Sequence, residues 1–511
     1  MANKSTKGIW KVISASSMGT MIEWYDFYIF GSLAVVIATK FFPSTNPTAA
    51  FLSTLATFAA GFVVRPFGAL FFGRLGDMIG RKYTFMVTLL LMGGATFLIG
   101  CIPSYDSIGY LAPILVLILR LLQGLALGGE YGGAATYVAE HSPVGERGFW
   151  TSWIQTTATV GLFISLMVIL ATKNVLTAEQ FDDWGWRVPF WVSILMVIIS
   201  YLIRTNMDES PVFAQAKLEG KTSSNPIKES FGNTYNLKFV LLALFGATMG
   251  QGVVWYTGQF YAMNFIKTVM NVDSSQVDTL LGIALILGTP FFIFFGWLSD
   301  KIGRKYIMMA GILFAVLLYR PIYKAMYQTT NIENKVEIRH KSITISSVVE
   351  NKKQLLDSVY TIKKSYSDGT ELLQLKTVSL ENGRPTLVDG HPKVETATTI
   401  IINSADKWKL VFFVFLQVIF VTMVYGPIAA FLVEMFPAKI RYTSMSLPYH
   451  VGNGIFGGLL PAISTYFVTQ AKEQNNPEYY LEGLWYPIIV ASVCFVIGMI
   501  YIRNKNENAH L

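Results

Sequence analysis

GRLGDMIGRKY, from Gly73 to Tyr83, decides how this chain is organised, because a near copy, GWLSDKIGRKY, runs from Gly296 to Tyr306. Eight of the eleven positions are identical, and each copy follows a long apolar run. The same short hydrophilic turn at equivalent places in two stretches of chain is typical of an internal repeat. The sequence therefore predicts two equivalent halves.

A second pair of segments supports the repeat and locates an insertion. YVAEHSPVGER and FLVEMFPAKIR carry a glutamate, a proline and an arginine at the same offsets, each after an apolar run. Asp77 and Glu140 lie 63 residues apart, whereas Asp300 and Glu434 lie 134 residues apart. The second half therefore holds about 71 extra residues, and a polar stretch over residues 328–407 supplies them.

The composition indicates a membrane protein. The chain has 511 residues, of which 52% are hydrophobic and 14% charged, and its mean hydropathy is +0.45. It is too apolar for an ordinary soluble enzyme. Its net charge of +8 comes mostly from short loops beside apolar runs, which is an orientation signal and not a nucleic-acid site. Cys101 and Cys494 lie far apart, so they predict neither a disulfide framework nor a metal site.

Apolar runs long enough to cross a bilayer occur twelve times. A hydrocarbon core of ~30 Å needs about 20 helical residues. The first half has runs near 13–39, 49–72, 84–102, 111–139, 148–172 and 187–205, and the second half near 238–266, 277–298, 306–325, 408–433, 442–469 and 483–502. The first run contains two acids and no small-residue cleavage site, so it is predicted to be a retained span and not a signal peptide.

The basic residues orient these spans. The loops on the N-terminal side hold Lys4, Lys7, Lys11, Arg74, Arg81, Lys82, Arg147, Lys301, Arg304, Lys305, Lys439 and Arg441, whereas the opposite loops hold few, such as Lys40, Lys173, Lys267 and Lys472. By the positive-inside rule, both termini and both repeated turns are cytoplasmic, in a bacterial-type inner (plasma) membrane. The insert then lies outside.

The predicted fold is an all-α membrane protein of twelve helices in two six-helix bundles, with a small β-rich insert between helices 9 and 10. KVEIRHKSITI alternates apolar and polar residues, and Asp368-Gly369 and Asn382-Gly383 are typical hairpin turns. The expected units are an N-terminal bundle (1–205), a cytoplasmic linker (206–237), helices 7–9 (238–327), an extracytoplasmic insert (328–407) and helices 10–12 (408–511).

Several motifs carry a family resemblance. The paired GxLxDxxGRK turns on a six-plus-six plan resemble the major facilitator superfamily. MIEWYDFYIFG, RPFG at Arg65, RLLQGLALGGEYGG from Arg120 and WGWRVPF are similar to the metabolite:proton symporter family, which includes carriers of proline, betaine, shikimate, citrate and 2-oxoglutarate. The match covers nearly the whole chain except the insert, which departs from the usual family pattern. The resemblance implies the major facilitator fold and does not choose among these substrates.

Ionisable residues inside the spans are candidates for proton coupling, because each costs ~2.5 kcal/mol or more unless it is paired or wet. The residues selected for this role are Glu23, Asp26, Arg120 and Glu130. Arg120, Gln123 and Glu130 fall within a sector of roughly 80° on one helix face. By resemblance to related carriers, Arg120 and Asp26 occupy the places of a proton-linked pair. A purely structural ion pair is the alternative.

Substrate-binding candidates are the polar and aromatic residues of the spans: Arg65, Arg120, Gln123, Gln251, Trp255, Tyr256, Gln259, His450 and Asn453. Two arginines facing one cavity suit a carboxylate, because a guanidinium binds it bidentately. Gln251, Trp255 and Gln259 recur at every fourth position, a stripe that suits a carboxylate or a quaternary amine. A snorkelling Arg65, a packing stripe and a hydrogen-bonded His450 are the structural alternatives.

Charged residues around the repeated turns are candidates for gating: Asp77, Arg81, Glu140, Arg147, Asp300, Arg304, Glu434 and Arg441. All lie on the predicted cytoplasmic side near helix ends, and the two aspartate–arginine pairs are four residues apart. Together they are expected to stabilise the outward-open state. Their contacts are expected to break and form again as the halves rock.

The chain lacks a phosphate-binding GxxxxGK[ST] loop and the HExxH, CxxC and Ser-His-Asp signatures, so we expect no enzyme, no cofactor and no metal. Our hypothesis is a monomeric carrier that imports a small organic acid or zwitterion with protons across the lipid bilayer by rocker-switch alternating access. The alternatives are an uncoupled facilitator or exporter of the same fold, and a membrane-anchored receptor that uses the insert.

Overall fold

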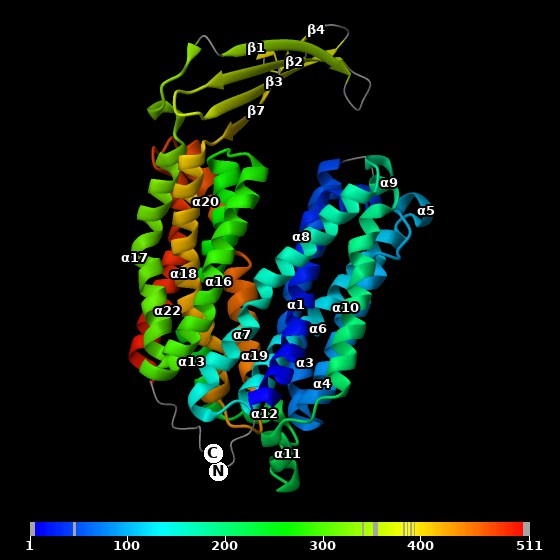
Figure 1. Cartoon of the computed structure of the whole chain (residues 1–511), viewed down its shortest axis with the longest axis vertical. Helices are drawn as coiled ribbons and strands as arrows, with labels where there is room; N and C mark the ends of the chain where they lie inside the picture. The colour runs from blue at the N-terminus through cyan, green and yellow to red at the C-terminus, as the bar shows by residue number, and fades with distance from the viewer. Residues whose placement is uncertain are drawn as a thin grey trace.

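Two bundles of long helices and a small antiparallel sheet make up the molecule (Figure 1). The computed structural model describes residues 6–43, 47–339, 342–350, 356–381, 384–385, 387–388, 391–392 and 394–503.

The first half forms one bundle. It contains α1 (Thr6–Ser32), α2 (Ala34–Phe41), α3 (Pro47–Met78), α4 (Arg81–Ile99), α5 (Tyr105–Ile108), α6 (Leu111–His141), α7 (Arg147–Gln155), α8 (Thr157–Val175), α9 (Ala178–Asp183) and α10 (Val188–Thr205). The first expected span is not straight, because α1 and α2 meet at 68°. Gly31 and Ser32 precede the bend, and such pairs are a recognised cause of helix kinks.

The second half forms the other bundle, reached through a linker with short helices α11 (Pro211–Leu218) and α12 (Pro226–Phe231). Its seventh span joins α13 (Thr234–Ala243), α14 (Met249–Tyr256) and α15 (Ala262–Asn264) through π-helical turns η3 (Leu244–Thr248), η4 (Thr257–Tyr261) and η5 (Phe265–Val269). The others are α16 (Ser274–Ile302), α17 (Arg304–Thr330), α18 (Ser404–Met435), α19 (Arg441–Val451) with the π-helical η8 (Gly452–Gly457) and α20 (Leu460–Glu473), and α21 (Tyr479–Glu482) with α22 (Trp485–Tyr501).

The helices account for the apolar runs. Among the described residues, ten helical segments are long and apolar enough to cross a membrane, and α1 with α2 makes an eleventh. The 32-residue α3 covers the remaining expected span. A helix satisfies its own backbone hydrogen bonds in lipid, which is why apolar runs of this length become helices. The predicted all-helical membrane fold is confirmed.

The repeated turn has a backbone reason for its glycine. Gly80 precedes α4 with φ of 140°, and Gly303 precedes α17 with φ of 103°. A side chain is strained at such φ values, whereas glycine adopts them freely. Each GRKY segment therefore reverses the chain at the same glycine.

The insert is a sheet, as the alternating pattern predicted. Strands β1 (Ile343–Glu350), β2 (Leu356–Ser365), β3 (Glu371–Glu381) and β7 (Val394–Ile401) pair antiparallel in that order, β4 (Arg384–Pro385) pairs with the end of β3, and β5 (Leu387–Val388) pairs with β6 (His391–Pro392). The predicted turn at Asp368-Gly369 joins β2 to β3, with Gly369 at φ of 87°. The other predicted turn, Asn382-Gly383, lies outside the described residues.

The sheet is attached to the second half. The backbone of Ile400 in β7 bonds to Asn271 and Asp273 in the loop before α16. Lys335 forms ion pairs with Asp368 and, at 2.6 Å, with Asp406 in the first turn of α18. The sheet stands at one end of the molecule, which we call the sheet end; α1 begins and α22 ends at the other, the terminal end (Figure 1).

Lys335→Met should loosen the sheet. The Lys335 side chain is 9% exposed and also donates to Thr370 Oγ1 at 3.0 Å, so its loss removes the cation shared by Asp368 and Asp406 and leaves Asn403 as their common hydrogen-bond donor. We expect local stability to fall by about 2 kcal/mol, measured as faster deuterium exchange in β2, β3 and β7. Lys363→Met is the matched control, because its 2.8 Å pair with Glu371 is exposed and worth less than about 1 kcal/mol. Equal effects of the two substitutions would contradict the assignment.

Acid should loosen the same attachment. Partial burial of Asp368 opposes its charged form, but hydrogen bonds from Lys335 and Thr370 outweigh this and hold the pKa of Asp368 below its ordinary value. A lowered folded-state pKa contributes stability above the ordinary value of about 3.9 and loses it as the pH falls further. Deuterium exchange of the sheet, corrected for its intrinsic pH dependence, should therefore rise below about pH 4. An unchanged corrected rate would contradict this role.

Candidate functional site

One cluster of polar side chains within the spans is centred on Asp26 of α1. Its Oδ2 atom accepts a hydrogen bond from Arg120 Nη1 at 2.8 Å. Its Oδ1 atom accepts from Gln123 Nε2 at 2.9 Å and from Thr96 Oγ1 at 3.0 Å. Asp26, Arg120 and Gln123 are at most 5% exposed. The structure thus brings together these three predicted residues, and their role in proton coupling stays a prediction.

A second ion pair joins α1 to α3, one helical turn before Asp26. Arg65 Nη1 lies 3.3 Å from Glu23 Oε1, and the guanidinium lies 4.3 Å from the ring centre of Phe62. Gly124 and Gly128 of α6 allow α3 to come this close, because a Cβ at Gly128 would lie 2.2 Å from the carbonyl oxygen of Arg65. Arg65 is therefore held inside the bundle and faces Glu23.

Two adjacent pockets meet at this pair. The first-half pocket, with an empty volume of about 270 Å³ including open solvent, is lined by α1, α3 and α6, including Asp26 and Arg120. The central pocket, about 390 Å³ on the same measure, is lined by both halves. Glu23, Phe62 and Arg65 line both. The Asp26 cluster therefore borders the space between the halves through Glu23 and Arg65.

Aromatic side chains form most of the central pocket wall. Trp24 of the first half lies 5.0 Å from Trp255 of the second, centre to centre. Tyr449 stacks on Tyr131 at 3.7 Å and shares a 2.5 Å hydroxyl contact with Tyr425. Aromatic faces attract cations, so this wall suits an ammonium group.

Two polar groups of the second half also line the central pocket. Asn453 exchanges two hydrogen bonds with Gln251, at 2.9 and 3.0 Å, which fixes both amides. His450 is 2% exposed, and its Nε2 atom has no hydrogen-bond partner among the described residues. Trp255, Tyr256, His450 and Asn453 are thus all pocket-lining, and Gln251 lies directly behind Asn453.

Gln259 does not join them. The four-residue spacing predicted one stripe through Gln251, Trp255 and Gln259, but Gln259 lies outside the lining of both pockets. The π-helical turn η4 begins at Thr257, between Trp255 and Gln259. A π turn takes up an extra residue and rotates the rest of the helix relative to the preceding turns, so a regular α-helical stripe does not continue through it.

Glu130 belongs to a separate network. Its Oε1 atom accepts from Arg204 Nη2 at 2.5 Å and its Oε2 atom accepts from Thr88 Oγ1 at 2.7 Å. Glu130 lines neither pocket, so sharing a broad helix face with Arg120 did not place it beside Asp26. Its partner, Arg204, is the basic residue in the last turn of α10 and was not predicted from the sequence. The signal that could have identified it is that Glu130, an acid inside a span, had no cation assigned to it.

The repeated aspartates each bind a helix of the opposite half. Asp77 accepts from the backbone N–H groups of Tyr442 and Thr443 at the start of α19, at 3.3 and 2.8 Å. Asp300 accepts from those of Gly148 and Phe149 at the start of α7, at 2.8 and 2.7 Å. A carboxylate at a helix N-terminus is favoured by unpaired N–H groups and the helix dipole.

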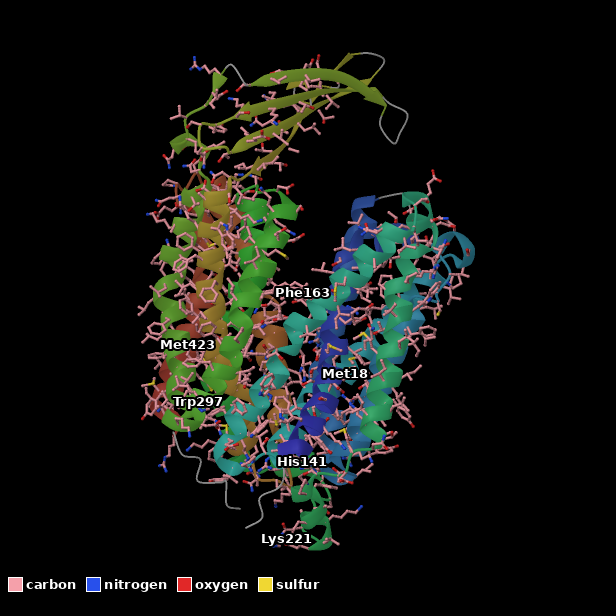
Figure 2. The ribbon with its side chains drawn as sticks, in the orientation of Figure 1. Met18, His141, Phe163, Lys221, Trp297 and Met423 are labelled. Carbon is pink, nitrogen blue, oxygen red and sulfur yellow. The ribbon has the colours of Figure 1, made fainter. Side chains whose placement is uncertain are left out.

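The remaining gating candidates form ion pairs within each half and between the halves, and Glu140–Arg441 and Arg147–Glu434 are the pairs that cross. Glu140 binds Arg441 at 2.9 Å, and Arg81 lies 3.5 Å from Glu140. Glu434 binds Arg304 at 2.5 Å, and Arg147 lies 4.0 Å from it. Figure 2 places His141, next in sequence to Glu140, at the terminal end. The halves are thus joined by charged groups there, while their helices diverge toward the sheet end (Figure 1).

Comparison with known proteins identifies the family of this chain. Residues 11–349 match the model of the "Sugar (and other) transporter" family. The chain belongs to this family, within the major facilitator superfamily. The transporter is 32% identical over 460 residues to the inner membrane metabolite transport protein YhjE of Escherichia coli K12, with 90% of this chain and 88% of the relative covered. It is 28% identical over 510 residues to the proline/betaine transporter of the same strain, with 97% and 84% covered.

A solved structure has the same fold. The proton:xylose symporter XylE bound to 6-bromo-6-deoxy-D-glucose aligns with the transporter at a TM-score of 0.69, with 99% of this chain and 98% of that chain covered. At 13% identity this likeness concerns the fold alone. The family resemblance of the motifs is confirmed: the protein is a membrane transporter and not an enzyme.

Several residues of the transporter's site were not found from sequence. Thr96 completes the Asp26 cluster, Tyr425 and Tyr449 line the central pocket, and Tyr131 stacks on Tyr449. A lone threonine or tyrosine in an apolar run is common, so no spacing marked them. Their positions depend on how the helices pack.

Asp300→Asn should weaken the closed terminal end. The neutral amide loses the charge that α7's N-terminus favours, worth roughly 0.3–2 kcal/mol, so a several-fold shift toward separated halves is expected. Spin labels at Val144 and Ile302, both exposed there, should report longer distances by double electron–electron resonance in a Cys101→Ser, Cys494→Ser background. Asp106→Asn, an exposed carboxylate in α5, is the control. Unchanged distances in Asp300→Asn would show that this contact does not hold the state.

Proposed function

We propose that this transporter imports a small organic anion or zwitterion together with protons, by rocker-switch alternating access between its halves. The observation that carries the proposal is the Asp26–Arg120 pair, buried in one half and bordering a pocket that adjoins the space between the halves. A carboxylate in this position can hold a proton when its arginine is engaged elsewhere and release it when the arginine returns.

The conformation supports alternating access. The inter-half ion pairs of the gating residues lie at the terminal end, and the central pocket is lined by both halves. The basic residues near that end favour a cytoplasmic location for it, with both termini inside and the sheet outside. The state is then outward-open, ready to accept a substrate from outside.

The central pocket supports the substrate class. Arg65 offers a guanidinium for a carboxylate, and the aromatic wall of Trp24, Trp255 and Tyr425 suits a cationic nitrogen. One relative is named a proline/betaine transporter, and both compounds are small zwitterions with these two groups. A zwitterion of this size would contact both halves at once.

Asp26→Asn should separate coupling from transport. One coupled proton supports about tenfold accumulation per unit of pH gradient, since 1.4 kcal/mol corresponds to a factor of ten. In proteoliposomes with an imposed gradient of one pH unit, the variant should reach an accumulation limit for proline or glycine betaine about tenfold below that of the unsubstituted protein, yet exchange the substrate across the membrane at a rate near that of the unsubstituted protein.

Asp183→Asn, an exposed carboxylate in the outer loop of the first half, should accumulate normally. An unchanged accumulation limit in Asp26→Asn would mean that Asp26 does not carry a coupled proton. If the unsubstituted protein does not accumulate substrate in response to a pH gradient, the result would instead favour an uncoupled facilitator of the same fold.

A further inference from the structure

The Glu23–Arg65 pair differs from the Asp26–Arg120 pair in its access. Glu23 and Arg65 line the central pocket as well as the first-half pocket, whereas Asp26 and Arg120 line the first-half pocket and not the central one. Arg65 contacts Glu23 through Nη1 at 3.3 Å, and its buried Nε atom has no hydrogen-bond partner among the described residues. The guanidinium therefore keeps donor capacity beside the space where a substrate would lie.

A second polar atom without a partner belongs to a residue that lines the central pocket from the other half. His450 Nε2 is buried and has no partner among the described residues, and His450 is 2% exposed. Buried polar atoms without partners are rare, and each is costly unless something binds it. Arg65 and His450 thus line the same pocket, one from each half, and each has a buried atom without a hydrogen-bond partner among the described residues.

We propose that a substrate carboxylate replaces Glu23 on Arg65, with His450 as a second contact, and that the displaced Glu23 takes up a proton. The inference rests on the proposed function and adds to it a second, substrate-dependent proton site. Its ligand class is a carboxylate, alone or as part of a zwitterion.

The chemistry is a competition for one cation. A guanidinium binds a carboxylate best through two parallel N–H bonds, which the single long contact from Arg65 to Glu23 does not provide. A substrate carboxylate that accepts two N–H bonds from Arg65 leaves Glu23 buried without its arginine. A buried, unpaired carboxylate becomes neutral rather than remaining charged, so Glu23 binds one proton from the open side. When the substrate leaves, Arg65 returns to Glu23 and that proton is released.

The surroundings of Glu23 favour this exchange. The titratable and charged groups that face Glu23 from its own and neighbouring helices are Asp26, Arg65, Arg120, Glu130, Tyr131, Tyr256, Tyr425, Tyr449 and His450. Arg120 already holds Asp26, and Arg204 already holds Glu130. No cation among these groups is left for Glu23 once Arg65 is taken.

The accumulation limit tests the proton count. At zero membrane potential and a gradient of one pH unit, two coupled protons support about hundredfold accumulation and one supports about tenfold. With proline, glycine betaine, shikimate and 2-oxoglutarate as probes in proteoliposomes, Glu23→Gln should lower the limit for the transported probe about tenfold. Glu179→Gln, an exposed carboxylate in α9, is the matched control and should not lower it.

Proton uptake on binding tests the exchange without transport. In weakly buffered detergent solution, proline or glycine betaine should draw protons from the medium, whereas prolinamide and choline, which lack the carboxylate, should not draw the Glu23 proton. In Arg65→Gln, Glu23 has no arginine to lose and is protonated beforehand. This uptake should then disappear although Glu23 is present.

The outcomes are distinguishable. An unchanged limit in Glu23→Gln, equal proton uptake with the amide or alcohol analogue, or binding of none of the four carboxylates would overturn the inference. The first two results would leave the proposed function intact. An accumulation limit that is unchanged in Asp26→Asn would overturn the proposed function instead.

Discussion

The cost of a charge inside a membrane-spanning bundle is the constraint on which the arrangement of the first half depends. Glu23 and Asp26 lie three residues apart on α1, so both face the same neighbours. Each is paired with an arginine from a different helix, Arg65 of α3 and Arg120 of α6. Rotating α1 or withdrawing either neighbour would leave a buried charge without its partner, which costs far more than a surface pair gains. These two pairs therefore hold α1, α3 and α6 in one register.

Duplication explains how the halves hold each other. Each copy of the repeated turn places an aspartate on the first N–H groups of a helix in the opposite half, Asp77 on α19 and Asp300 on α7. The contacts are reciprocal because the turns and the helices they bind are both repeated. The symmetry ends at the insert, which only the second half contains. Among the described residues, the sheet's backbone and Lys335 bind that half, so the sheet moves with it.

The sequence predicted most of the fold because lipid leaves few choices. Apolar runs become helices of membrane length, and the repeat sets the two bundles. Charged residues are rare in the spans, so Asp26 and Arg120 could be selected from the sequence. Gln123 could be selected because it shares a helix face with Arg120. The features that sequence reasoning missed depend on how helices rotate and pack: the π turn that moves Gln259, the pairing of Glu130 with Arg204, and the tyrosines of the pocket wall. A helical wheel shows which residues share a face, but not which helix that face meets.

The placement of the two pockets bears on how a rocking motion can couple two ligands. The first-half pocket lies within one bundle, so Asp26 and Arg120 keep their separation when the bundles move as rigid bodies. The central pocket lies between the bundles, so every contact made there by both halves changes in the same motion. A group that lines both pockets is the one place where a change in the central pocket reaches the charges of the first half directly. Glu23 and Arg65 hold that position, because α1 and α3 face α6 on one side and the second half on the other.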